Sequence, residues 1–363
     1  MTAAVEQSVG ASTAAPQSLV SRLGALLDER DLRMLGDRLR RLDMIAAADL
    51  MAVDHAIQAL PRGGSLAIRS AGHLLDLGGK RLRPLCVALA ARLGAGFDKS
   101  AHKLATAVEL VHSATLLHDD VVDYGEVRRG AATARAVFGN AASIFAGDWL
   151  LIEALGMVRE ANVEDTLARL LDVIREMILG ESLQLELRGK LVPDRASYLA
   201  VVEGKTASLF SWATYAGARA GGLDVDQAVA LERYGRRLGV AFQIVDDLLD
   251  FAGRPERLGK ALHSDLREGK TTYPLLLALE RVPSLRPALE KMLAAEPTHE
   301  GPPDLALLEE LKHALELSDA IPESRRFAES YAREAILALQ SLPECPAREA
   351  LETVATAALS RDA

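Results

Sequence analysis

The sequence between Ser100 and Asp123 reads SAHKLATAVELVHSATLLHDDVVD, and it decides the fold class. Its apolar residues recur at the three- and four-residue spacing of a helix buried along one face, and it ends on aspartates. Three other stretches, 142–161, 163–188 and 226–250, have a similar length and pattern. Because helices this long usually line a central bundle, we predict an all-α fold around a central cavity.

The composition supports a single helical domain. Apolar residues make up 49% of the 363 residues and aromatic residues only 4%, which is typical of packed helices rather than of a sheet. Helical periodicity runs from about Leu19 to Leu359, so we predict one domain over 18–363. Residues 1–17 are rich in Ala, Ser, Thr and Gln, and we predict a disordered tail there.

The charge and the cysteines restrict the partners and the compartment. The formal charge is −9 and the isoelectric point is about 5.5. A nucleic-acid partner would need a broad basic surface, so we predict none. Cys86 and Cys345 lack metal-ligand spacing. We expect them to be reduced thiols, as in a cytoplasmic protein.

Nothing in the sequence predicts a transmembrane segment. The most apolar stretch, 143–158, is interrupted by Asp148 and Glu153 and is too short to span a bilayer. Residues 31–43 place four arginines among Leu and Met, which predicts an amphipathic surface helix. A peripheral membrane contact through such a helix is the alternative to simple packing.

Two aspartate clusters each end a long apolar stretch. The first is Asp119, Asp120 and Asp123, and the second is Asp246, Asp247 and Asp250. In both, the first and last acids are four residues apart and share one helix face. Like charges this close are destabilising unless a cation compensates them. Carboxylates are ligands that Mg²⁺ prefers, and Mg²⁺ often completes its shell with substrate phosphate, so the clusters predict a magnesium–diphosphate site.

Basic residues follow or precede these clusters at several points. GGKRLRP occupies 78–84, with Lys80 and Arg83 at a predicted helix start where free backbone N–H groups attract phosphate. RRG occupies 128–130 and GKT occupies 204–206, while Lys260 and Lys270 follow the second cluster. We expect these cations to converge on the diphosphate.

These motifs, in this order, resemble those of the isoprenyl diphosphate synthase family. The resemblance covers about Gly78 to Pro274 and comprises GGKRLRP, ELVHSATLLHDDVVDYGEVRRG, FGNAASIFAGDWLL, GESLQ, EGKTASLF, FQIVDDLLDF and LREGKTTYPLL. It implies an isoprenoid-synthase-type bundle and a homodimer. It also implies a magnesium-dependent all-trans polyprenyl diphosphate synthase, which condenses isopentenyl diphosphate with an allylic diphosphate.

The resemblance assigns residues to two diphosphate subsites. Isopentenyl diphosphate would bind Gly79, Lys80, Arg83, His112 and Arg129. The allylic diphosphate would bind Arg128, Lys205, Thr206, Gln243 and Lys260. Asp119, Asp123, Asp246 and Asp250 would hold three magnesium ions, and Asp120 and Asp247 complete the expected catalytic set with Lys205 and Lys260. The chain departs from the family at 261–265, where it retains one acid of a pair, and at 124–126.

The family mechanism needs no protein nucleophile. The allylic C–O bond ionises, the double bond of isopentenyl diphosphate attacks the cation, and a proton is lost to pyrophosphate. Water must be excluded because it would quench the cation, which agrees with the apolar helices around each cluster.

Small residues upstream of the first cluster favour a long product. The growing tail should pass Thr115, Ala114 and Val111, and none of these would close the pocket. We therefore predict products longer than twenty carbons, unless Met177, Ile178 or Phe210 on another helix closes the tunnel. The alternatives are a geranylgeranyl or farnesyl diphosphate synthase, a terpene cyclase and a non-catalytic subunit.

Overall fold

The structure is a computed structural model that describes residues 29–191, 194–252, 264–294 and 305–360. The predicted disordered tail, 1–17, lies outside these residues, and so does Lys260 with its neighbours up to residue 263. The described residues form helices apart from one two-stranded hairpin, so the all-α prediction is confirmed. In the hairpin, β1 (Val127–Arg128) pairs antiparallel with β2 (Ala131–Ala132).

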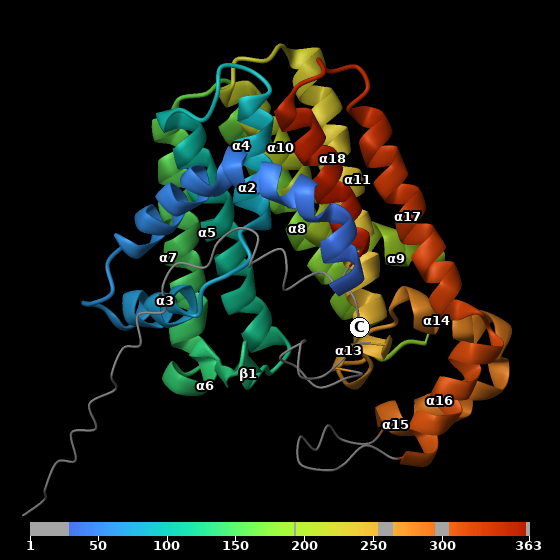
Figure 1. Ribbon diagram of the computed structural model, residues 1–363. Coiled ribbons are helices and arrows are strands. Elements are labelled where there is room, and N and C mark those ends of the chain that lie inside the picture. Colours follow the sequence, from blue (N-terminus) through green and yellow to red (C-terminus); the bar gives the residue numbers. More distant parts are fainter. Residues whose placement is uncertain (1–28, 192–193, 253–263, 295–304, 361–363) are drawn as a thin grey trace, which may run out of the picture.

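Figure 1 shows the described helices in their order along the chain. They are α2 (Glu29–Gln58), α3 (Leu66–Asp76), α4 (Leu82–Arg92), α5 (Lys99–Val122), α6 (Ala134–Phe138), α7 (Asn140–Ala161), α8 (Thr166–Leu187), α9 (Arg195–Val202), the π-helix η1 (Glu203–Ala207), α10 (Ser208–Ala220), α11 (Val225–Ala252), α13 (Ser264–Arg267), α14 (Tyr273–Arg281), the 3₁₀-helix η2 (Pro283–Leu285), α15 (Arg286–Ala294), α16 (Leu305–Leu317), α17 (Ala320–Ala338) and α18 (Pro346–Leu359).

The long helices agree with the sequence periodicity. The four predicted long helices correspond to α5, α7, α8 and α11, with bounds that differ by no more than three residues. The surface helix predicted over 31–43 was too short, because α2 continues to Gln58. Its apolar stripe also continues, from Leu39 to Ile57, and is buried throughout.

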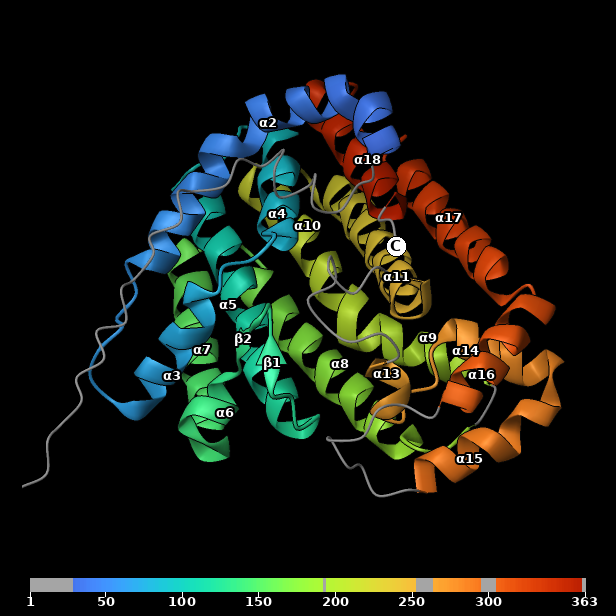
Figure 2. The same ribbon diagram turned by 60° about the horizontal axis from the view of Figure 1, so that its bottom comes forward.

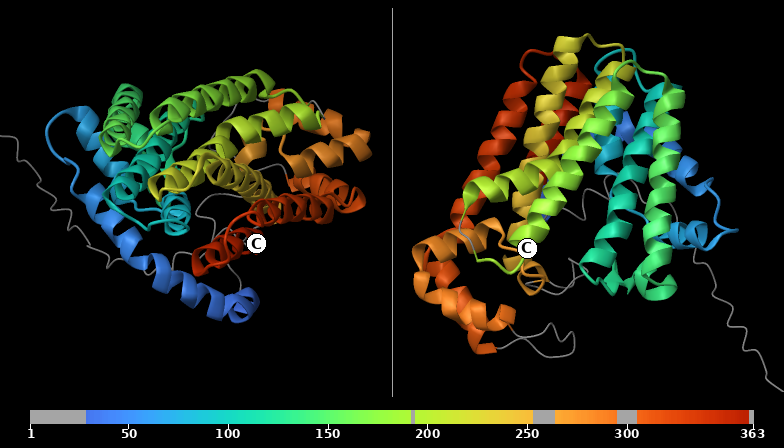
Figure 3. Two further views of the ribbon diagram at one scale, coloured as in Figure 1. Left: turned by 90° about the horizontal axis from the view of Figure 1, so that it is seen from above. Right: turned by 180° about the vertical axis from the view of Figure 1, so that it is seen from behind.

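The helices are arranged in layers. Viewed from above, α2, α17 and α18 lie on one side and α8 on the other, with α10 and α11 between them (Figure 3). α5 packs along α7, and α11 packs against both α10 and α17. Buried side chains from these helices form two apolar clusters. Each fully buried Leu or Val in them contributes about 1.5–3 kcal/mol to stability.

α5, α8 and α11 all end at the same end of the bundle. Figure 2 shows the hairpin beside the end of α5, and α13 close to the end of α11. Both aspartate clusters are therefore at this end, because the clusters occupy the last turns of α5 and α11.

Among the described helices, α7 is long and apolar enough to cross a bilayer by length and composition alone, with a mean hydropathy of 1.5. It packs against α5 and α3 within the bundle. Its outward face exposes Phe145 and Ile152.

Candidate active site

The first aspartate cluster meets protein cations from three other segments. The Nζ of Lys205, on η1, lies 3.5 Å from Oδ2 of Asp119. The Nζ of Lys270 lies 2.8 Å from Oδ2 of Asp123, and Arg188, just after α8, also forms an ion pair with Asp123. Burial raises the pKa of Asp119, although Lys205 opposes this shift. The two carboxylates thus lie where positive charge from α8, η1 and the loop before α14 converges.

Asp120 has a different environment from its two neighbours. Its side chain is 3% exposed and accepts hydrogen bonds from Arg128, with Nη2 at 2.8 Å and Nε at 3.0 Å from Oδ1. Successive residues on a helix are rotated by 100°, so Asp120 faces the hairpin rather than Lys205 and Lys270. Asp120 therefore orients Arg128.

Residues predicted to bind isopentenyl diphosphate gather around a buried carboxylate that the sequence did not single out. Glu109, on α5, accepts from Nη1 of Arg81 at 2.5 Å. Arg83 lies over the ring of Phe210, 4.5 Å from its centroid, and its buried Nε has no hydrogen-bond partner among the described residues. Burial lowers the pKa of Arg83 and Glu109 opposes the shift. Arg83 is therefore held against Phe210 with a buried N–H donor that a ligand could use.

His112 and Arg129 belong to the same group. Burial, together with Arg83 and Arg129, lowers the pKa of His112 well below its ordinary value, so the imidazole is neutral at neutral pH. Burial also lowers the pKa of Arg129, while Glu109 raises it. Lys80, one residue before Arg81, is exposed.

Gly79, predicted to let the chain approach phosphate, also lies beside the Arg81–Glu109 ion pair. A Cβ at this position would lie 2.7 Å from Nη1 of Arg81 and 3.1 Å from Oε1 of Glu109. Glycine therefore leaves the loop room beside the Arg81–Glu109 ion pair, which a larger residue would have to displace.

Lys205 is placed by a close helix crossing. Its π-helix, η1, crosses α8 where two glycines meet: a Cβ on Gly180 would lie 2.8 Å from the backbone N of Lys205. π-Helical turns are frequent at functional sites. The crossing brings Nζ of Lys205 to 2.9 Å from Oε1 of Gln184 and into an ion pair with Glu181.

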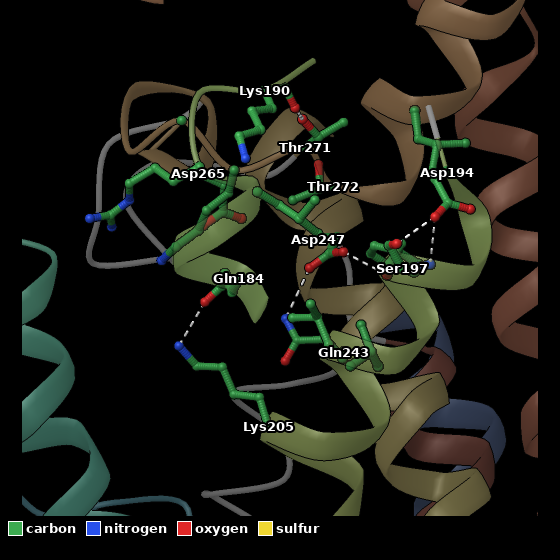
Figure 4. A pocket seen from close by; sticks show the side chains of 18 of the residues that line it. Gln184, Lys190, Asp194, Ser197, Lys205, Gln243, Asp247, Asp265, Thr271 and Thr272 are labelled. Carbon is green, nitrogen blue, oxygen red and sulfur yellow. Dashed lines mark hydrogen bonds between the residues drawn. The ribbon is translucent and has the colours of Figure 1, made fainter. Parts of the chain in front are cut away.

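A hydrogen-bonded chain connects η1, α11 and α9, and Figure 4 shows its central bond, between Gln243 and Asp247. Thr206 donates to Oε1 of Gln243 at 2.8 Å, and Nε2 of Gln243 donates to Asp247 at 2.9 Å. The hydroxyl of Tyr198 donates to the other oxygen of Asp247 at 2.7 Å. Burial, with a contribution from Asp265, raises the pKa of Asp247 to about 8.

A cavity opens beside this chain. Its volume is about 140 Å³, and its lining includes Lys205, Thr206, Gln243, Asp247 and Lys270. Three of these were predicted to bind the allylic diphosphate. The structure thus brings Lys205, Thr206 and Gln243 to one wall of one cavity.

The other acids of the second cluster are arranged differently from Asp247. Asp246 is half-buried, whereas Asp250 is fully buried and accepts from the backbone N–H of Asp265 at 3.1 Å. Among the described residues, no three acids, histidines or cysteines form a group that could hold a metal ion. In the first cluster, Lys205, Lys270 and Arg188 contact the oxygens that a metal would use.

The residues predicted to set product length lie on α5. Val111 and Ala114 are buried and Thr115 is half-buried, its hydroxyl donating to the carbonyl of His112 at 2.8 Å. Of the residues on other helices, Met177 and Phe210 are buried. Ile178 is 60% exposed on the outside of α8, so it does not close an internal tunnel.

Sequence reasoning missed four members of the site. Glu109 and Arg81 lie within quoted motifs but were given no role, and Arg188 and Tyr198 were not considered. A signal was present for Glu109, since it precedes His112 by three residues and shares its helix face.

The comparisons with known proteins agree with this geometry. A family described as Polyprenyl synthetase matches residues 66–307. Octaprenyl diphosphate synthase of Escherichia coli (strain K12) is 37% identical over 331 residues, which cover 89% of this chain and 99% of that protein.

Two solved structures are also similar over most of their length. The polyprenyl synthase from Caulobacter crescentus CB15, complexed with calcium and isoprenyl diphosphate, is 40% identical with a TM-score of 0.82, covering 89% of this chain and 98% of that chain. A decaprenyl diphosphate synthase from Rhodobacter capsulatus is 34% identical with a TM-score of 0.79 and the same coverage of both chains.

Proposed function

This chain belongs to the polyprenyl synthetase family, and from that premise we propose that it is a magnesium-dependent trans-prenyltransferase that condenses isopentenyl diphosphate with an allylic diphosphate. The product is a polyprenyl diphosphate longer than twenty carbons. The similar octaprenyl and decaprenyl diphosphate synthases support this length over a fifteen- or twenty-carbon product.

The position of Lys205 is the observation that carries the proposal. Its ammonium contacts Asp119 of α5, while the next residue, Thr206, donates to Gln243 of α11. One turn of π-helix thus connects both aspartate-bearing helices and places a cation between them. A diphosphate in this position would receive charge and hydrogen bonds from both sides.

The acids suit magnesium in their chemistry. Asp119 and Asp123 offer hard oxygen ligands at a helix end, and they contact cations in this structure. Asp119, Asp123, Asp246 and Asp250 would hold the ions, three in all, whose charge stabilises the departing pyrophosphate. Lys205 and Lys270 would then turn from the carboxylates toward phosphate oxygens.

The remaining steps depend on the chain's own residues. Arg128, oriented by Asp120, contacts the allylic diphosphate with Lys205 and Lys270, and the allylic C–O bond breaks as these cations draw on the leaving group. Arg83 and the neutral His112 orient isopentenyl diphosphate for attack on the allylic cation. The proton lost after the C–C bond forms passes to pyrophosphate, and the apolar walls exclude water.

Two helices expose apolar side chains that suit a second copy of the chain. α7 exposes Phe145 and Ile152, and α8 exposes Ile178 and Leu179, each at least 60% exposed. Figure 3 shows α8 on the outer face in the view from behind. We propose a homodimer through this face. Ile152→Glu should give a monomer by light scattering, whereas Met44→Glu, at an exposed side chain of α2, should leave a dimer. A dimeric Ile152→Glu protein would contradict the proposal.

The proposed location is the cytoplasm, where both free cysteines stay reduced. Because a hydrocarbon tail longer than twenty carbons is insoluble in water, a peripheral membrane contact during product release belongs to the same proposal.

The reaction is tested with labelled isopentenyl diphosphate, Mg²⁺ and allylic primers of increasing length, followed by sizing of the product. Products beyond twenty carbons are expected. Asp119→Ala should lower the rate by orders of magnitude, whereas Asp172→Ala, which removes an exposed carboxylate on α8, should not. An absence of condensation with every primer would refute the enzyme, and products that stop at fifteen or twenty carbons would refute the chain length.

A further inference from the structure

Arg81 forms a buried ion triad that connects three parts of the fold. Its Nε lies 2.9 Å from Oδ1 of Asp54, on α2, and its Nη1 lies 2.5 Å from Oε1 of Glu109, on α5. The side chains of Arg81, Asp54 and Glu109 are 6%, 12% and 5% exposed. Although burial lowers the pKa of Arg81, Glu109 and Asp54 together raise it.

The backbone at Arg81 is held in an unfavourable conformation. Its φ of 55° and ψ of 33° lie in the left-handed region, which a residue with a Cβ seldom occupies. Such conformations persist only where the surroundings fix them. Here the two carboxylates hold the side chain, and the turn they fix lies between Lys80 and the first turn of α4, which carries Arg83.

Glu109 also lies close to Arg129, because a Cβ on Gly79 would meet Oε1 of Glu109 at 3.1 Å and Nη2 of Arg129 at 3.4 Å. The same Cβ would lie 2.7 Å from Nη1 of Arg81, so the loop at Gly79 passes close to the Arg81–Glu109 pair. Burial lowers the pKa of Arg83 and of Arg129, and Glu109 opposes both shifts, whereas Arg81 and Arg128 lower the pKa of Arg129 further. Glu109 therefore limits repulsion among three guanidinium groups before any diphosphate binds.

We propose that Glu109 and Arg81, anchored by Asp54, are positioning residues of the isopentenyl diphosphate pocket. They hold the loop of Lys80 and the guanidinium groups of Arg83 and Arg129 in the arrangement that receives the diphosphate. A carboxylate repels a diphosphate, so Glu109 acts through the arginines and does not touch the substrate. This inference rests on the proposed function.

The test separates the two substrates. Glu109→Gln and Asp54→Asn keep the shape of each side chain and remove its charge. We expect each to raise the KM for isopentenyl diphosphate about tenfold, because small displacements of binding groups are costly, and to leave the KM for the allylic diphosphate within about twofold. Calorimetric titration with isopentenyl diphosphate alone should show the same loss of affinity.

Asp49→Asn is the matched control. Asp49 is a buried carboxylate of α2 that pairs with Arg92 of α4 at 2.6 Å, so Asp49→Asn, like Asp54→Asn, removes an ion pair of α2. It should lower the melting temperature without changing either KM. Equal rises in both KM values, or the same selective rise in Asp49→Asn, would show a merely structural role and overturn the proposal. So would an unchanged or lower KM for isopentenyl diphosphate in folded Glu109→Gln protein.

Arg81→Lys covers the case in which the neutral variants fail to fold. Lysine keeps the charge but lacks the planar fork that contacts both carboxylates. A selective rise in the KM for isopentenyl diphosphate is expected, and unchanged kinetics would overturn the proposal. If the wild-type protein condenses no substrates, the proposed function fails; if it is active and these variants match it, only the positioning role fails.

Discussion

Arg188 and Lys270 bind opposite oxygens of Asp123. Arg188 pairs with Oδ1 and Lys270 with Oδ2, and the side chain of Asp123 is 13% exposed. Although burial raises the pKa of Asp123, the charge of Lys270, with help from Lys205 and Arg188, holds it below its ordinary value. The carboxylate is therefore ionised, and its oxygens are already matched with positive charge.

Arg188 should compete with magnesium for Asp123. A partly buried ion pair contributes on the order of 1 kcal/mol to the free energy of the state that contains it, which corresponds to about a fivefold change in an equilibrium constant. We expect Arg188→Met to lower the Mg²⁺ concentration required for half-maximal activity by about that factor. In the absence of substrate, the variant should also gain more thermal stability from Mg²⁺ than the wild type does.

The control for this experiment is Arg195→Met, which removes an arginine paired with Glu280 on the surface. It should leave the Mg²⁺ requirement unchanged. A weaker response to Mg²⁺ in Arg188→Met would mean that Arg188 helps to hold the metal–diphosphate complex rather than competing with it.

Gly180 should tolerate no side chain. The Cβ of an alanine would lie 2.8 Å from the backbone N of Lys205 and 3.1 Å from the carbonyl carbon of Gly204. Since neither backbone atom can turn aside, Gly180→Ala should destabilise the protein by about 1–3 kcal/mol and displace Lys205. A lower melting temperature and a lower kcat are expected together.

Gly36 provides the comparison, because a Cβ there has no atom within 4 Å among its described surroundings. In the interior of α2, Gly36→Ala should raise stability by about 0.5–1 kcal/mol, and kcat should not change. If both alanine variants behave alike, the close crossing of α8 and η1 does not place Lys205.

The two cysteines should differ in reactivity. Cys86 is fully buried on α4, and burial raises the pKa of its thiol to about 12, although Arg83 opposes the shift. Since only the thiolate reacts, a disulfide reagent at pH 8 should label one thiol in the native protein, that of half-buried Cys345, and two in denaturant. Rapid labelling of two thiols per native chain would show that α4 opens readily.

The sequence predicted the helices better than their contacts. The bounds of α5 and α11 follow from their own periodicity, so both aspartate clusters could be placed on helix ends. The ion pair of Arg188 with Asp123 could not be predicted, because it depends on how α8 crosses the bundle relative to α5, and the two residues are 65 positions apart.

The same limit applies within a motif. The spacing of the first cluster predicts that Asp120 lies on a different helix face from Asp119. It does not predict that Asp120 binds Arg128, because that contact depends on how the following hairpin folds back. For Glu109, the sequence shows an acid within an apolar helix. Its role depends on Arg81, whose left-handed backbone conformation leaves no clear signal in the sequence.

Ala114 and Val111 should control where the product stops. Both are buried on α5, the helix along which the tail is predicted to run. They lie about 4.5 Å apart along the helix axis, which is close to the length of one isoprene unit. Ala114→Phe should give a shorter product than the wild type. Val111→Phe should stop about one isoprene unit later than Ala114→Phe, because its ring lies one turn farther from Asp119.

Overpacking by either ring should cost about 1–3 kcal/mol, so thermal stability is measured beside product length. The lengths of the two products distinguish a blocked tunnel from general damage to the protein. A damaged protein makes less product of unchanged length, whereas a blocked tunnel makes two different shorter products. If both variants fold and retain the wild-type length, the tail does not run along α5, and the buried side chains of Met177 and Phe210 become the next positions to enlarge.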